Sequence, residues 1–538
     1  MALNRKIAYI DLNRKKIDIT PIPLQWRRRF LGGRGIGAYL LLKHASPKCD
    51  ALGSDNVIVI STGLLGGTLA TLSGCTFVMA KSPLSNLLCN VQLKGLFASE
   101  IRWAGFDHLV ITGCARRPVY LYINNGTVEI RDAKKVWGKN VSKAHEQIRQ
   151  ELKNEDIRMI GIGPSGENLV RFATLTTDEN AISGRTGIGA VFGSKNIKTV
   201  VCRGTMDLEI KRPDDVLKFK TKNAGQADDI QKKNVTQTDQ LEQKIAIRDI
   251  TPSKLTDCGF NSFAESKFLT RELGMDPLAV SGMLNWAFTL FEKGNLKANK
   301  ANSLKFNPEN PDSVGEMIKH IAYRKGVGNI LAKGSFRAAA IIGYSSLNYF
   351  APVKWLIKLY SEDPLPANFA SLMPTGKDTD IVEPDGLEPL EGNAGSITLD
   401  EINEMILNCL GIFVEKGLVS LFDGDPLKRL IEQIRFNTGL NFDANELKKI
   451  ACRCYALERL FNIGEEVTWR NDFHPDCSFD VPSGLEMTGP MWDSIDLKEF
   501  KRKVSKYYRQ RRWSKKDLLK AGVFKKLEID DLWPSLRR

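Results

Sequence analysis

SGRTGIGAVFGSKN, residues 183–196, places four glycines in the ten positions from Gly184 to Gly193. Glycine is this dense where the backbone must adopt positive φ or approach another group closely. Arg185 and Lys195 flank the last three glycines, and an arginine fork with a lysine charge suits a phosphate or another oxyanion. The stretch therefore predicts an anion-binding loop, and the plain alternative is a tight turn that opens a packed helix.

Two nucleotide-binding motifs are excluded by the spacing of these glycines. A dinucleotide fingerprint needs G-x-G-x-x-G after a strand, whereas residues 187–193 read G-x-G-x-x-x-G. A Walker A loop ends in Gly-Lys-Ser/Thr, whereas residues 193–196 read Gly-Ser-Lys-Asn. The loop must therefore serve another anion or another purpose.

The overall composition is that of a globular chain. Its 538 residues are 42% hydrophobic and 26% charged, which allows two or three domains with ample cores. We find no run of eighteen apolar residues and expect no membrane span. Residues 1–20 lack the apolar segment of a secretory signal and instead predict a strand hairpin, so we expect a cytoplasmic protein.

Cysteine spacing and charge limit the classes of site and partner. The ten cysteines contain no C-x-x-C, and Cys452 and Cys454 form the only close pair, so no locally built cluster or zinc site is predicted. The net charge of +14 is densest at residues 498–526. This run is typical of a solvated helix face, and a basic nucleic-acid-binding protein is the remote alternative.

The pattern of hydrophobic residues along the chain changes near residue 210. Glycine and β-branched segments dominate residues 1–205, whereas helical periodicity dominates after Asp214, for example at 329–342 and 398–416. We expect an α+β protein, with a sheet-rich domain over residues 1–210 followed by mainly helical domains over residues 211–396 and 397–538. Residues 226–257 and 364–395 read as long irregular stretches.

Four further glycine-rich loops share the chemistry of residues 183–196. They are residues 32–39, 62–68, 82–95 and 162–168, and the set includes the cations Arg34, Lys94, Arg185 and Lys195. Together they suggest a sheet domain whose backbone surrounds a large anionic ligand. We therefore expect residues 32–37, 92–95, 163–168 and 184–189 to converge on one cleft.

These motifs resemble the N-terminal domain of the aldehyde ferredoxin oxidoreductase family. The resemblance rests on GGRGIGAYLL, KSPLS, WAGFD, IGPSGENLVRFA and GRTGIGAVFGSKN, at residues 32–41, 81–85, 103–107, 162–173 and 184–196. It continues more weakly through the helical part, for example at 322–328 and 457–462. The family holds tungsten or molybdenum on two pyranopterins linked through Mg²⁺, and its first domain forms two sheets that sandwich the pterins.

The resemblance also implies an activity, partners and site residues. The family oxidises aldehydes to carboxylic acids and passes electrons to ferredoxin through a [4Fe-4S] cluster. Ferredoxin or an electron-transfer subunit and a small aldehyde are the implied partners, and a homodimer is compatible with the resemblance. The residues that would bind the cofactor are Ser183, Gly184, Arg185 and Gly187 at the pterin, Gln92, Lys94 and Gly95 near Mg²⁺, and Asp363, Asn408 and Gly411 in two late motifs.

Several family positions are altered in this chain. The C-x-x-C-x-x-x-C segment that binds the cluster has no counterpart, and the late D-x-x-G-x-C motif has Asn408 for Asp and Phe413 for Cys. Cys258 and Cys409 alone are too few for a cluster, so we expect the chain alone to bind no [4Fe-4S]. Cys75 replaces an arginine that would meet a phosphate. None of the five histidines matches the family's active-site histidine, so no catalytic residue or metal ligand is assigned.

Two functions therefore stay open beside the remote alternative of a nucleic-acid-binding protein. The first is an aldehyde ferredoxin oxidoreductase-like enzyme whose iron-sulfur cluster is supplied by a partner chain. The second is a catalytically impaired paralogue or partner subunit that keeps the fold but lacks the iron-sulfur cluster. The missing thiolates favour the second function, and the intact residues 162–168 and 184–196 favour the first.

Overall fold

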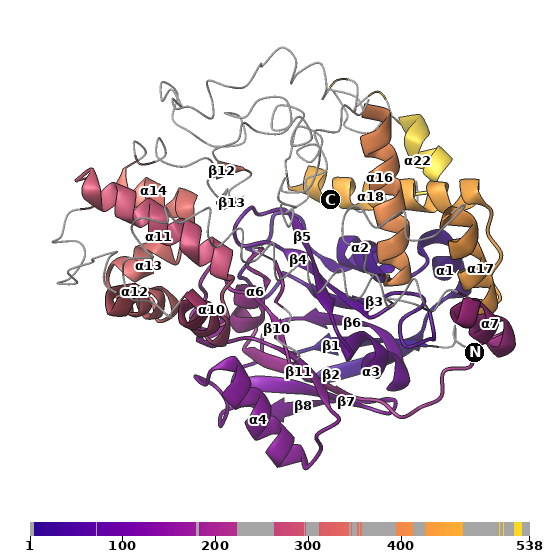
Figure 1. The fold of residues 1–538 in the computed structure, drawn as a ribbon, viewed down its shortest axis with the longest axis horizontal. Coiled ribbons are helices and arrows are strands. Elements are labelled where there is room, and N and C mark those ends of the chain that lie inside the picture. Colours follow the sequence, from indigo (N-terminus) through magenta and orange to yellow (C-terminus); the bar gives the residue numbers. More distant parts are fainter. Residues whose placement is uncertain are drawn as a thin grey trace.

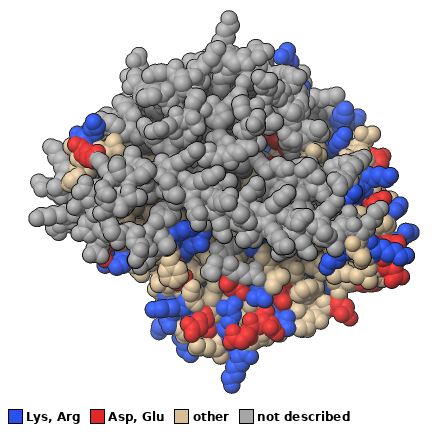
Figure 2. Space-filling view, viewed as in Figure 1, with Lys and Arg blue, Asp and Glu red and all other residues tan. Residues whose placement is uncertain are grey.

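The computed structural model has the α+β architecture that the sequence predicts, with sheets in the first part of the chain and helices in the rest (Figure 1). No helix in the part of the chain it describes is long and apolar enough to cross a membrane. On the face drawn in Figure 2, described basic and acidic side chains are interspersed. The structure describes residues 5–70, 73–178, 182–184, 186–222, 263–294, 296, 311–343, 346, 352–353, 356–357, 394–412, 426–465, 505, 509 and 521–529.

The first sheet has six strands in the order β2-β1-β6-β3-β4-β5. Strands β1 and β2 form the hairpin expected at the N-terminus, β1 and β6 run parallel, and the other neighbours are antiparallel. Its strands are β1 (Lys6–Asp11), β2 (Lys16–Pro21), β3 (Ile58–Thr62), β4 (Cys75–Lys81), β5 (Leu88–Lys94) and β6 (Phe106–Thr112).

The second sheet has five strands in the order β10-β9-β11-β7-β8. They are β7 (Val119–Asn124), β8 (Thr127–Asp132), β9 (Arg158–Gly161), β10 (Thr176–Thr177) and β11 (Ile197–Arg203). Helix α4 (Val141–Leu152) covers the outer face of this sheet, where Ala144 and Ile148 join a core with Tyr120 and Val201.

The two sheets pack face to face over an apolar core. Ile60 and Val91 of the first sheet and Leu121 and Val200 of the second belong to this core and are fully buried. Alternation along each strand places these residues on the inner faces. The expectation that the sheets sandwich a pterin is therefore wrong for this chain, because side chains fill the space between them.

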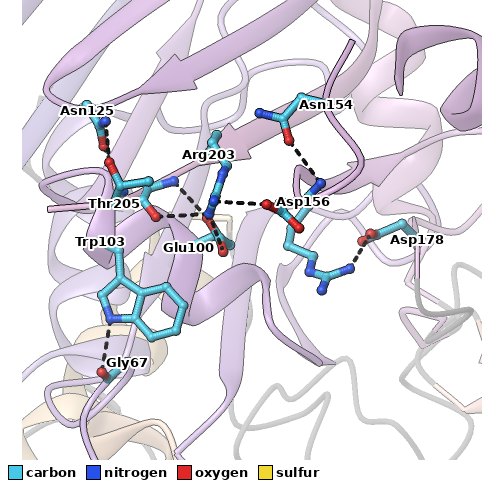
Figure 3. Close-up of polar contacts among 11 residues, drawn as sticks. Gly67, Glu100, Trp103, Asn125, Asn154, Asp156, Asp178, Arg203 and Thr205 are labelled. Carbon is cyan, nitrogen blue, oxygen red and sulfur yellow. Dashed lines mark hydrogen bonds and ion pairs between the residues drawn. The ribbon is translucent and has the colours of Figure 1, made fainter. Parts of the chain in front are cut away.

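Helix α3 (Phe97–Trp103) ties the two sheets together at one end (Figure 3). Arg203, the last residue of β11, donates to both carboxylate oxygens of Glu100 at 3.3 Å, and the amide of Gly204 donates to the same carboxylate at 2.7 Å. One turn later, the Trp103 indole donates to the carbonyl of Gly67 at 3.1 Å. The helix thus fixes the loop after β3 relative to both sheets.

The outer face of the first sheet is covered by helices from both ends of the chain (Figure 1). Phe30, Leu41 and Met79 share one buried core with Leu410 and Leu457. The contributing helices are α1 (Leu24–Phe30), α2 (Gly33–His44), α16 (Ala394–Leu410), α17 (Pro426–Thr438), α18 (Ala444–Gly464) and α22 (Ala521–Leu527).

A second helical group packs beside the first domain on residues 170–173. Val170 and Phe172 share a buried core with Met283 and Ile321. The helices are α10 (Phe263–Glu272), α11 (Pro277–Glu292), α12 (Pro311–Ala322), α13 (Val327–Leu331) and α14 (Ser335–Ile342). The predicted helix 329–342 is divided between α13 and α14, because Gly334 between them has φ +82°.

The remaining elements are short. They are α5 (Pro164–Glu167), α6 (Ile188–Ser194), α7 (Pro213–Lys222), β12 (Pro352–Val353) and β13 (Leu356–Ile357). The domain boundaries at residues 210 and 396 stay predictions.

Candidate functional site

The segment after α16 lies directly on the glycine loops of the first domain. The amides of Leu64 and Leu65 donate to the carbonyls of Cys409 and Leu410 at 3.1 and 3.0 Å. The amide of Cys75, which begins β4, donates to the carbonyl of Gly411 at 3.2 Å. Residues 408–411, predicted from the late family motif, therefore join loops that lie more than 300 positions earlier in the sequence.

Two glycines make this close approach possible. A Cβ on Gly63 would lie 2.0 Å from the amide nitrogen of Gly411, and one on Gly33 would lie 2.2 Å from the carbonyl oxygen of Asn408. Real Cβ atoms do not approach other atoms so closely, so a larger residue would displace the segment. These two glycines contact the chain's own backbone, which is a structural reason for the glycine-rich loops.

A buried charge network holds the loop that receives the segment. Arg102 donates to the carbonyls of Leu64 and Gly66, both at 2.7 Å, and to Asp107 at 2.9 Å. Arg27 donates to the other oxygen of Asp107 at 2.5 Å. Burial alone would raise the pKa of Asp107, but the two arginine charges lower it to about 2. Asp107 is thus a permanent anion that orients Arg102.

The outer face of β5 carries a polar row beside this segment. Asn90, Gln92 and Lys94 alternate with the buried residues of β5, and Lys94 lies opposite Cys75 in the sheet register. The Gln92 amide donates to the Cys75 sulfur at 3.2 Å, and burial raises the pKa of Cys75 to about 12. Gly95 follows with φ +129°. The structure thus brings Gln92, Lys94 and Gly95 close to Gly411, and their role in binding a cofactor stays a prediction.

Asn90 was missed in the sequence, although the period of two along a strand places it on the same face as Gln92. Its side-chain oxygen is buried and has no hydrogen-bond partner among the residues that the structure describes. A buried amide oxygen without a donor costs free energy, so this atom fits an N–H donor on a bound group. The β5 face therefore has features that a polar cofactor such as a pterin would satisfy.

The loop at residues 183–187 forms a second group at the other end of the β4–β5 hairpin. The Ser82 hydroxyl donates to the carbonyl of Thr186 at 2.7 Å, and the Ser183 hydroxyl accepts from the amide of Leu175 at 2.7 Å. Gly187 has φ +78°, and a Cβ there would lie 2.0 Å from the carbonyl oxygen of Arg171. The carbonyl of Gly184 accepts from the amide of Thr186. Arg185 lies outside the described residues.

The two groups are separated by the length of the hairpin. Cys75 and Lys81 begin and end β4, and a strand rises about 3.3 Å per residue, so the groups lie roughly 20 Å apart. The loops expected to converge on one cleft therefore do not meet at one point. Residues 163–166 instead contact Leu273 and Gly274 of the second helical group. A ligand that touches both groups would have to span the hairpin.

Two of the cations assigned to an anionic ligand are buried in the protein itself. Arg34 donates to both carboxylate oxygens of Glu458, at 2.5 and 2.8 Å. The Lys195 ammonium donates to the carbonyls of Ser54 and Gly113 at 3.1 and 2.9 Å, and burial lowers its pKa to about 8. The suggestion that these two side chains face a ligand is wrong, because each is already bonded within the core.

The described thiols do not form a cluster site. Cys409 on α16 and Cys454 on α18 face each other with their sulfurs 3.9 Å apart, and both are fully buried. Burial raises the pKa of Cys454 well above its ordinary value. No three His, Cys, Asp or Glu side chains in the described ranges could hold a metal ion. These residues therefore do not fit a [4Fe-4S] cluster; Cys258, Phe413 and Asp363 lie outside the described part.

Two histidines are buried in structural positions. His108 contacts the Ser61 hydroxyl at 2.7 Å, and His145 lies on α4 against the second sheet. Burial lowers the pKa of each to about 3. Both imidazoles are therefore neutral near pH 7 and act in packing.

Comparison with known proteins gives matches over almost the whole chain. The pattern of the aldehyde ferredoxin oxidoreductase N-terminal domain matches residues 7–204, and that of domains 2 and 3 of the same family matches residues 255–529. A tungsten-containing aldehyde ferredoxin oxidoreductase of Pyrococcus furiosus is 28% identical over 97% of this chain and 98% of its own.

Other relatives carry different names. The WOR-like subunit of an aliphatic sulfonate oxidoreductase of Pyrococcus furiosus is 26% identical over 100% of this chain and 99% of its own. Among solved structures, the active site complex BamBC of benzoyl coenzyme A reductase has a similar fold, with a TM-score of 0.76 and 21% identity over 99% of this chain and 98% of that one.

Proposed function

The chain belongs to the aldehyde ferredoxin oxidoreductase family, and on that basis we propose that it oxidises a small aldehyde to a carboxylic acid and passes the electrons to ferredoxin or to an electron-transfer subunit. Membership of this tungsten-containing family implies a pterin cofactor. The observation that carries the proposal is the contact between the two matched regions, because residues 408–411 of the second lie on the glycine loops of the first. We expect the protein to act in the cytoplasm.

The polar face of β5 is the proposed holding surface for one end of the cofactor. Asn90 would accept an N–H from it, Gln92 and Lys94 would meet its polar and anionic groups, and the backbone at Gly95 and Gly411 would border it. A pterin-bound tungsten or molybdenum supplies two-electron redox chemistry when it is present. The residues that would meet the other end, by resemblance, are Ser183, Gly184, Arg185 and Gly187. Asp363 and Asn408 are the residues implied by the late motifs, and Asn408 lies beside Gly411 at the β5 end.

Metal and pterin content test this proposal directly. Protein purified without oxygen should contain tungsten or molybdenum by mass spectrometry and release a fluorescent pterin, and it should reduce a viologen dye when an aldehyde is added. Asn90→Ala should lower the pterin content, whereas the control Asn140→Ala, next to α4, should not. Wild-type protein that contains neither metal nor pterin would contradict the proposal.

Arg185 offers a second variant for the other end of the cofactor. A planar arginine fork binds oxyanions in a geometry that lysine does not copy. A charged hydrogen bond contributes roughly 1.5–3 kcal/mol, so Arg185→Lys should weaken pterin binding about ten- to a hundredfold at nearly unchanged melting temperature. A lower melting temperature at unchanged pterin content would instead assign Arg185 to the structure of the loop.

The second candidate function is that of a partner subunit without its own cluster. It is favoured by the two thiols of Cys409 and Cys454, which face each other with no third thiol beside them among the described residues. One relative is itself named a subunit, which supports this candidate. Stoichiometric iron with cluster absorbance in the isolated chain would rule this candidate out, whereas pterin without iron would support it.

The same dye-reduction assay distinguishes between classes of aldehyde substrate. Short aliphatic and aromatic aldehydes should support dye reduction if the proposal holds as stated. Because one relative is named for aliphatic sulfonates, a sulfonated aldehyde belongs in the same series. A response to the sulfonated compound alone would narrow the substrate to that class.

A further inference from the structure

A basic cavity lies between the first domain and the second helical group, away from the β5 face. Its volume is about 400 Å³, and it is lined by Leu52, Asn168, Leu169, Arg171, Arg324, Lys333, Arg337 and Ile341. These residues come from the loop before β3, the segment after α5, the turn between α12 and α13, the turn before α14, and α14 itself. Cavities of this size accept small organic molecules.

Four of the eight lining side chains are cations, and none is an acid. Arg171 and Arg337 donate to the carbonyls of Pro83 and Leu84, at 2.7 and 3.0 Å, and Arg324 donates to the carbonyl of Leu169 at 2.7 Å. Each guanidinium has five N–H donors, so these bonds fix the arginines in place and leave donors over.

No carboxylate of the described residues forms an ion pair with any of the four cations, and the ammonium group of Lys333 makes no hydrogen bond with a described residue. The charge of Asp50 acts on Arg171 and Arg337 from a greater distance. Burial and then repulsion from Arg171 lower the pKa of Arg337 to about 10, and they lower that of Arg324 as well. The fold thus holds like charges together with no described carboxylate in direct contact with them.

We propose that this cavity binds a small organic phosphate, with its phosphate or diphosphate on the four cations and its carbon skeleton against Leu52, Leu169 and Ile341. Phosphate oxygens suit the arginine forks in pairs, and a lysine adds a point charge. Ile341 is 44% exposed, and a ligand would cover it. This site is separate from the proposed oxidoreductase site, because none of its lining residues is among those proposed to hold the cofactor.

The cavity is also connected to the loop at residues 183–187. Arg171 and Arg337 hold Pro83 and Leu84, and Ser82 of the same turn donates to the carbonyl of Thr186. The carbonyl of Arg171 is the atom that a Cβ on Gly187 would meet. A bound phosphate would therefore stiffen the turn at 82–85, and its binding can be measured without any redox assay.

Calorimetry and thermal shift with the full chain test the site. The probes are inorganic phosphate, pyrophosphate, ADP and citrate in a chloride buffer. Pyrophosphate and ADP should bind and raise the melting temperature more than phosphate does, and citrate should bind more weakly than either. Lys333→Gln should weaken pyrophosphate binding about tenfold, the effect of losing one charged hydrogen bond. Lys325→Gln removes the same charge from an exposed neighbour outside the cavity and should leave binding unchanged.

Several outcomes would overturn the proposal. These are no binding by wild-type protein, tighter binding of citrate than of pyrophosphate, and equal effects of the two lysine variants, which would indicate a diffuse charge effect. If Lys333→Gln does not fold, lysine-specific labelling of wild-type protein gives the same decision. Pyrophosphate should then protect Lys333 and leave Lys325 reactive; equal labelling of both lysines with and without pyrophosphate would refute the site.

Discussion

Arg34→Gln removes the cation from the buried ion pair that joins α2 to α18. Arg34 and Glu458 are each 3% exposed, and the arginine contacts both carboxylate oxygens. Its second partner, Glu404, lies 3.3 Å away and is 43% exposed, so it contributes less. Removing one member of a buried pair leaves the other charge uncompensated and destabilises a protein by about 3–5 kcal/mol.

Urea unfolding followed by tryptophan fluorescence measures this loss. Arg34→Gln and Glu458→Gln should each shift the unfolding midpoint to much lower urea. The double variant Arg34→Met with Glu458→Leu should lose less than the sum of the two single changes, because no unpaired charge is left. Arg131→Gln is the control, since Arg131 and Glu129 form an exposed pair expected to contribute about 0–1 kcal/mol.

The same variant decides between two roles for Arg34. If Arg34→Gln leaves the unfolding midpoint unchanged but lowers the pterin content, Arg34 faces the cofactor and the ion-pair reasoning is refuted. If the losses of stability in the two single variants add up to the loss in the double variant, as they do for distant sites, Arg34 and Glu458 do not interact in solution.

Three further predictions use the buried groups. Burial lowers the pKa of His145 to about 3, whereas in the unfolded chain it is about 6.5. The stabilisation by neutral His145 is therefore fully present above about pH 6.5 and is lost as the pH falls toward 3. His145→Gln should flatten the pH dependence of the free energy of unfolding, measured by urea, by up to about 1.4 kcal/mol per pH unit over that interval. Gly63→Ala should cost about 1–3 kcal/mol or more and expose residues 408–411 to protease, because its Cβ meets the Gly411 amide; unchanged protection would refute the docking. Native Cys75 should react with iodoacetamide far more slowly than the partly exposed Cys452, as mass spectrometry can show, and equal rates would contradict its burial.

The sheets could be predicted because their residues alternate or are apolar throughout. Val119–Asn124 and Ile197–Arg203 are β-branched runs bounded by polar turns, and both are strands. The ends of the helices were harder to predict from the sequence. The predicted helix 398–416 is α16, which begins at Ala394 and ends at Leu410, and Gly411 follows with φ +80° to turn the chain onto the glycine loops.

The partners of the charged residues could not be predicted. Arg34 looks in the sequence like an anion-binding cation in a glycine loop, but its partner Glu458 lies 424 positions later. The four cations of the basic cavity likewise come from separate segments between residues 171 and 337. Only tertiary packing brings such groups together, and no local pattern carries that information.

A glycine-rich motif therefore does not by itself indicate a ligand site. Gly33, Gly63 and Gly187 all permit contacts with the protein's own backbone, and those contacts persist whether or not a cofactor is bound. Retention of these motifs therefore follows from the fold alone. Polar groups that the protein leaves without partners carry the stronger indication, since a fold gains nothing from burying them unsatisfied. The oxygen of Asn90 is such a group, and the half-buried Lys333 lines the basic cavity without a carboxylate partner among the described residues, so experiments on ligand binding should begin with these two residues.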